Sequence, residues 1–142
     1  MVIQRWQSLL LLLAVIAMIA INFLPVASLP SQVSDPDSAT IMYLTDAPVP
    51  MIVSILVAVL LFIAIFMFKD LRMQMRVTIL SIVLLCVLAV AGIFVICHNA
   101  PGAEIVWFGA TLILVCAVVF ACAAYRFMRR DYHLLRSADR LR

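Results

Sequence analysis

The residues of this sequence best suited to chemistry are its four cysteines. Cys86, Cys116 and Cys122 lie inside apolar stretches, and the sequence contains no Cys-x-x-Cys pair. Thiol–disulfide exchange needs a thiolate and a partner thiol at an oxidising face, whereas a thiol surrounded by hydrocarbon behaves as a small apolar side chain. We therefore expect structural thiols rather than a redox pair.

Cys97 and His98 form the one fragment with the character of a metal site. A bound metal needs three or four ligands. The nearest further candidates are Asn99, Glu104 and the acids of the segment Ser28 to Val49. A polar group that ends an apolar helix explains the fragment more simply. We expect no metal and no cofactor.

The sequence lacks the residues that usually carry out catalysis or proton-coupled transport. No acid lies inside an apolar stretch, and His133 stands beside Asp131 in a charged segment where a solvated role is expected. The three glycines, at 92, 102 and 109, are too dispersed for a phosphate loop. Asn22, with Pro25 one turn later, indicates a bent helix end bonded to a neighbour rather than a transport site. The sequence therefore predicts no catalytic residue and a protein that is not an enzyme.

The composition decides which elements position these residues. The chain is 68% hydrophobic and 12% charged, with a mean hydropathy of +1.24, far more apolar than a soluble domain. Four uncharged stretches approach or reach the roughly 20 residues that cross a bilayer. The first is too long, and has Pro25 in the wrong place, for a cleaved signal peptide. We predict one all-α, polytopic membrane domain over residues 1–142, with four transmembrane helices in an antiparallel bundle at about 8–27, 49–68, 77–97 and 105–125.

The charges predict the orientation of these helices. All ten basic residues lie before the first stretch, between the second and third, or after the fourth. The two other loops, Ser28 to Val49 and His98 to Glu104, carry only acids among their charges. Because basic flanks stay in the cytoplasm, both termini are predicted to be cytoplasmic.

Small residues predict how the helices pack. Ala117, Ala121 and Ala124 recur at spacings of 4 and 3, so they share one face, as do Ala14 with Ala17 and Ala89 with Gly92. Such faces let membrane helices approach closely. In the first loop, "ATIMYL" is apolar enough to lie on the membrane surface or over the helix ends, and Asp46 is placed to cap the second helix.

The C-terminal segment 126–142 is predicted to form an amphipathic helix, continuing from or bending off the fourth span. At about 100° per residue, its leucines gather on one side and its arginines on the other. A basic face suits the headgroups of an anionic leaflet at the cytoplasmic surface. The candidate contacts with lipid or a partner protein are Arg129, Arg130, Arg136, Arg140 and Arg142.

Three segments also carry a family resemblance: "MVIQRWQSLLLLL", "KDLRMQMRV" and "RRDYHLLRSADRLR". Together they resemble a small bacterial inner-membrane family designated domain of unknown function 4293. The resemblance covers the whole chain and implies four membrane helices and a bacterial origin. It implies no activity.

These observations favour an accessory role in the inner membrane, as a scaffold or assembly partner. The alternative is an oligomeric transporter or channel for a small solute. The expected partners are the anionic bilayer surface and another membrane or cytoplasmic protein, with no nucleic acid.

Overall fold

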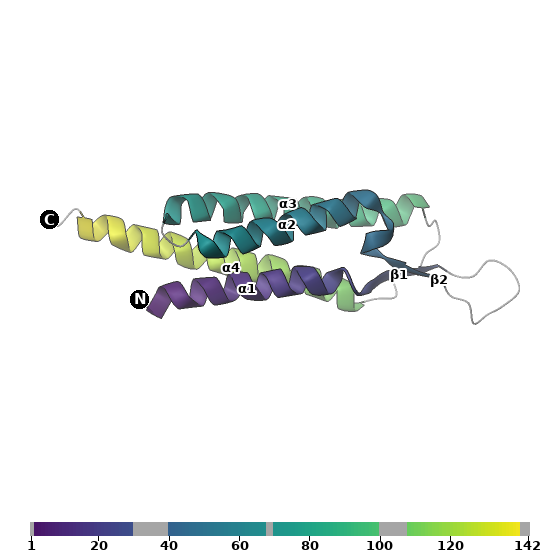
Figure 1. Cartoon of the computed structure of the whole chain (residues 1–142), viewed down its shortest axis with the longest axis horizontal. Helices are drawn as coiled ribbons and strands as arrows, with labels where there is room; N and C mark the ends of the chain where they lie inside the picture. Colours follow the sequence, from purple (N-terminus) through teal and green to yellow (C-terminus); the bar gives the residue numbers. More distant parts are fainter. Residues whose placement is uncertain (1, 30–39, 68–69, 100–107, 140–142) are drawn as a thin grey trace, which may run out of the picture.

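The computed structural model describes residues 2–29, 40–67, 70–99 and 108–139. In this part of the chain, four long helices lie side by side, and a small β-hairpin covers one end (Figure 1). The helices are α1 (Val2–Ile21), α2 (Pro48–Phe66), α3 (Leu71–Asn99) and α4 (Phe108–Asp139). The predicted all-α class is confirmed in its main feature.

The helices form a closed ring of neighbours. α1 packs against α2 and α4, and α3 packs against the same two helices, with α1 and α4 sharing the most extensive interface. The beginning of α1 and the end of α4 lie at the end of the bundle opposite the hairpin (Figure 1). We call this end the basic end, and it also holds the connection between α2 and α3. The opposite end of the bundle is the hairpin end.

Each helix buries a narrow seam of residues spaced alternately by four and three positions, with one spacing of seven in α4. This spacing keeps one face toward the neighbouring helices and is typical of nearly parallel helices that cross at about 20°. The seams are Gln7, Leu11, Ala14, Met18 and Ile21 in α1; Pro50, Ser54, Val57, Leu61 and Ala64 in α2; Gln74, Thr78, Ser81, Leu85 and Leu88 in α3; and Ala110, Ala117, Ala121, Ala124 and Met128 in α4.

The small residues follow the prediction in α4 and depart from it in α3. Ala117, Ala121 and Ala124 are all completely buried, which lets α4 lie close to its neighbours. A Cβ added to Gly92 would meet nothing within 4 Å. The Ala89–Gly92 face therefore makes no close helix contact at Gly92, because α3 leaves the packed core after Leu88.

Three helices are long and apolar enough to cross a membrane, which supports an integral membrane protein: Pro48–Phe66, Leu71–His98 and Gly109–Ser137. The apolar part of α1, Trp6–Ile21, is shorter. The first predicted span, 8–27, extends too far as a helix, because α1 begins at Val2 and ends at Ile21. Pro25 offers no backbone donor and disfavours helix before it, so the chain turns and enters a strand.

The other predicted bounds differ mainly at the basic end. α3 begins at Leu71 rather than 77, so most of the expected basic turn is helical. α4 runs without a break from the fourth predicted span into the C-terminal segment and ends at Asp139, so the structure has the continuous arrangement of the two that were predicted. Residues 100–104 of the loop His98 to Glu104 lie outside the described residues.

The hairpin pairs β1 (Pro25–Leu29) with β2 (Thr40–Tyr43) in antiparallel fashion, with Pro25 opposite Tyr43. A 3-10 turn, η1 (Leu44–Asp46), follows and buries Leu44 in the core. The described part of "ATIMYL", from Thr40 to Leu44, is thus a strand and the start of this turn, over the helix ends. The predicted cap is wrong: Ala47 precedes α2, and the Asp46 carboxylate instead accepts a hydrogen bond of 2.7 Å from the backbone N–H of Tyr43.

Candidate functional site

α4 is too long to lie entirely within the bundle. Its 32 residues span about 48 Å at about 1.5 Å per residue, against roughly 30 Å for the hydrocarbon core of a bilayer. At the basic end it extends past the beginning of α1 and past the α2–α3 turn (Figure 1). The predicted C-terminal helix is therefore confirmed as far as Asp139, as a direct continuation of α4.

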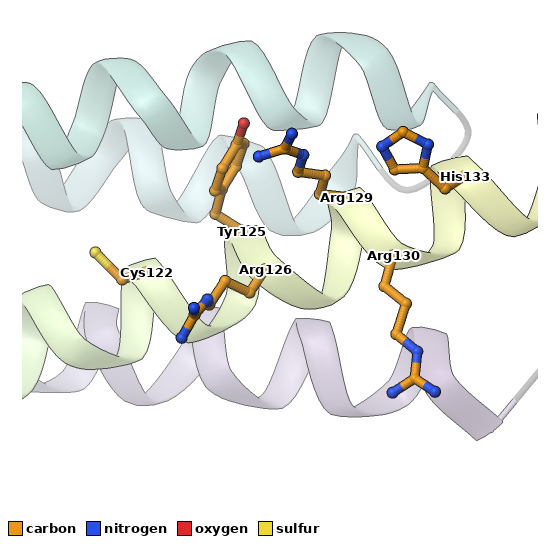
Figure 2. Close-up of a pocket in the computed structure, with 6 residues that line it drawn as sticks. All are labelled: Cys122, Tyr125, Arg126, Arg129, Arg130 and His133. Carbon is orange, nitrogen blue, oxygen red and sulfur yellow. The ribbon is translucent and has the colours of Figure 1, made fainter.

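A shallow, largely open groove lies on the exposed face of α4, between side chains of this one helix, where its charge-free part ends. Its volume is about 610 Å³, and it is shown in Figure 2. Cys122, Arg126, Arg129 and His133 follow one another at spacings of 4, 3 and 4, which places them on one face of a helix. The lining residues are Cys122, Tyr125, Arg126, Arg129, Arg130 and His133.

The arginines of this groove form two rows. Arg126 and Arg130, one turn apart, extend to one side of α4, whereas Tyr125, Arg129 and His133 extend to the other (Figure 2). The three guanidinium groups are exposed, and Cys122 and Tyr125 are half-buried. The groove therefore has basic walls and an uncharged end toward the apolar part of α4.

A partly buried hydrogen bond fixes the opposite face of α4. The Gln7 amide of α1 donates from Nε2 to Oδ2 of Asp131, and Gln7 itself is only 2% exposed. Asp131 lies about 160° around the helix from His133, at 100° per residue. The acid nearest to the groove in sequence is thus engaged with α1 and faces away from the groove.

A second contact holds α4 to α3 at the same level. The guanidinium carbon of Arg72 lies 5.5 Å from the centre of the Tyr132 ring, within the range of a cation–π interaction. Consecutive residues of α4 therefore contact two different helices. These contacts fix the rotation and position of the segment that carries the groove.

Buried polar groups also join α2, α3 and α4 beneath this level. Gln74 Nε2 donates to the carbonyl oxygen of Ala64 at 3.0 Å, across the turn between α2 and α3. The Thr78 hydroxyl donates to the Gln74 carbonyl at 2.8 Å and lies 3.8 Å from the Met128 sulfur. No buried side-chain nitrogen or oxygen among the described residues lacks a hydrogen-bond partner.

The structure brings only two of the predicted contact residues into the groove. Arg129 and Arg130 line it, whereas Arg136 is exposed further along α4. Arg140 and Arg142 lie outside the described residues. The prediction omitted Arg126 and His133, although their spacing from Arg129 placed them on the same helical face.

The remaining candidates from the sequence form no reactive cluster in the described residues. All four cysteines are free, with Cys86 and Cys97 exposed. Within the same ranges, no three His, Cys, Asp or Glu side chains come together as metal ligands. Asn22 behaves as the sequence indicated: its Nδ2 donates to Met18 O at 2.8 Å, and its Oδ1 accepts from Ser54 Oγ at 2.8 Å.

Comparison with known families resolves the resemblance seen in the sequence. A family model described as Domain of unknown function (DUF4293) matches residues 3–141. The chain belongs to this family. No curated protein and no solved structure matches it. The DUF4293 description carries no activity.

Proposed function

We propose that this DUF4293 protein is an accessory component of the bacterial inner membrane, a scaffold or assembly partner, rather than an enzyme. The observation that carries the proposal is the free end of α4. It projects beyond the bundle and exposes two neighbouring leucines among its arginines.

The packing seam of α4 supports a protein partner for this end. Ala124 and Met128 are completely buried, and Asp131 and Leu135 continue their spacing by three and four residues. Leu135 is nevertheless 60% exposed and Leu134 53% exposed. The face that packs against the bundle thus continues past it, which suits an additional helix that packs by the same 4-3 pattern.

The orientation belongs to the same proposal: four membrane-spanning helices with both termini and the basic end in the cytoplasm. The distribution of arginine and lysine supports it. A reporter cysteine between α2 and α3 tests this orientation. Met73 suits it better than the neighbouring Gln74, because Met73 is 45% exposed and Gln74 is buried. A membrane-impermeant thiol reagent should label Met73→Cys only after the membrane is opened, in a background without the native cysteines. Labelling of intact cells would contradict the orientation.

Crosslinking tests the accessory role. A photoreactive amino acid at Leu135 should give a discrete protein adduct in native membranes, and co-purification should recover the same partner. Val119, on the same helix and 55% exposed, is the matched control in the apolar part. It should react mainly with lipid.

The transporter alternative predicts a different outcome. The purified protein alone, in liposomes, would then carry a small solute, and its crosslinks would join copies of this chain. Solute flux without a partner adduct at Leu135 would replace the accessory role by transport.

A further inference from the structure

The membrane orientation proposed above, on which this inference rests, places the groove on α4 at the depth of the lipid phosphates. Residues 109–125 of α4 carry no charge, and Arg126, Arg129 and Arg130 follow immediately. Arg126 and Arg130 are separated by about 6 Å along the helix axis. The headgroup region of one leaflet is about 5–7 Å thick. The arginines of the groove therefore span the headgroup layer, with Cys122 and Tyr125 on the hydrocarbon side.

The positive charge of the groove is not neutralised within the described part of the chain. No carboxylate there pairs with Arg126, Arg129 or Arg130. Asp131 is held by Gln7 on the other face of α4. An anion that enters the groove thus meets guanidinium groups that need not first give up a protein partner.

The two rows of the groove fit two anionic groups better than one. Arg126 and Arg130 reach to one side of α4, and Arg129 and His133 reach to the other (Figure 2). Arginine can bind a phosphate through two parallel hydrogen bonds, which a lysine ammonium cannot reproduce. The rows thus offer two separate phosphate positions across one groove.

The groove is also fixed in position before any ligand arrives. The contacts of Gln7 with Asp131 and of Arg72 with Tyr132 hold α4 on two sides, beside the helical turns that carry the rows. A ligand therefore has to order only the arginine side chains, which lowers the entropic cost of binding.

We propose that this groove binds the headgroup of a membrane phospholipid with two phosphates, such as cardiolipin. One phosphate contacts Arg126 and Arg130, and the other contacts Arg129 and His133. The acyl chains lie along the apolar part of α4, past Cys122. Basic pockets at the cytoplasmic side of membrane helices are an established setting for such headgroups.

Substitution by lysine tests the proposal while preserving the positive charge. The full chain would be purified in detergent, and native mass spectrometry would measure its affinity for cardiolipin and for phosphatidylglycerol at twice the molar concentration. We expect cardiolipin to bind at least about tenfold more tightly than its monophosphate analogue. Arg126→Lys/Arg129→Lys/Arg130→Lys should remove this preference, and Arg136→Lys, on the same helix outside the groove, should leave it within about twofold.

Two further measurements complete the test: binding by single variants and competition by a soluble bisphosphate. The single variants Arg129→Lys and His133→Gln should each weaken cardiolipin binding severalfold, which keeps the test valid if the triple variant does not fold. A water-soluble glycerol bisphosphate should compete only weakly, because it lacks acyl chains.

Any of four results would overturn the proposal. If the lysine variants bind cardiolipin as tightly as the original protein, or if Arg136→Lys loses as much affinity as they do, the groove acts only as part of a diffuse positive surface. Equal affinity for the two lipids at equal charge would remove the second phosphate position. Full competition by the soluble bisphosphate at the same concentration would assign the groove to a soluble anion instead.

Discussion

The two ends of the bundle are held together in different ways. At the basic end, polar side chains join the helices: Gln7 to Asp131, Gln74 to Ala64, and Arg72 to Tyr132. At the hairpin end, Ser54 and Asn22 join α2 to the end of α1, and the remaining contacts are largely apolar packing beneath β1, β2 and η1.

α3 shows the difference along one helix. Its buried seam runs from Gln74 to Leu88, and among its described side chains none after Leu88 is buried. Gly92 borders a small cavity beneath the hairpin, and its Cβ position faces open space. The tightly connected end is also the end that carries the groove. This arrangement is expected if a binding surface has to keep its geometry.

The largest expected loss of stability comes from placing a bulkier side chain in the tightly packed seam. Ala124→Leu adds three carbons to a position with no exposed surface, so it should lower the free energy of unfolding by about 2 kcal/mol. Unfolding in mixed detergent and SDS measures this. Gly92→Leu adds a larger side chain at the hairpin end and should cost less than about 0.5 kcal/mol. Equal losses at both positions would remove the contrast between the two ends.

The next effect concerns the bond between α1 and α4. Asp131→Ala leaves the buried Gln7 amide without its acceptor, at a cost of about 1–2 kcal/mol in the same unfolding measurement. Asp131→Asn keeps an oxygen acceptor and should cost less than half as much. A double-mutant cycle with Gln7→Ala should show coupling, and additivity would mean that the two residues do not interact.

The corresponding bond at the hairpin end should matter less. Ser54→Ala removes the hydroxyl that donates to Asn22, whose own amide keeps its bond to Met18. Polar contacts between membrane helices average about 0.6 kcal/mol, and we expect a loss of that size. A loss above that of Asp131→Ala would reverse the ranking of the two ends.

The smallest effect is expected at the exposed contact between α3 and α4. Arg72→Ala should lower the free energy of unfolding by about 0.5 kcal/mol, because the guanidinium lies over the Tyr132 ring but is exposed. Tyr132→Phe keeps the ring and should be neutral, whereas Tyr132→Leu should match Arg72→Ala. If Tyr132→Phe is as harmful as Tyr132→Leu, the hydroxyl rather than the ring carries the contact.

Hydrophobic stretches predicted that helices would form, but their ends depended on other residues. The first helix was expected to end near Ala27, and it ends at Ile21, where Asn22 finds partners in Met18 and Ser54. The last helix was expected either to continue past Tyr125 or to bend there, and in the structure it continues to Asp139. Hydropathy measures where a chain prefers lipid, and that preference does not set where backbone hydrogen bonding stops.

The basic face of the C-terminal segment could also be predicted from the sequence. Helical periodicity alone places the arginines on one face, whatever the helix packs against. Periodicity did not distinguish the arginines that border a groove from Arg136, which lies on the same face beyond it. Gln7 lies 124 positions before Asp131, and only packing of α1 against α4 brings them together. The sequence by itself determined the apolar helices and the sign of charge at their ends. The tertiary structure decided which arginines have no carboxylate partner among the described residues, because a hydrogen bond between distant helices takes up the neighbouring acid, Asp131.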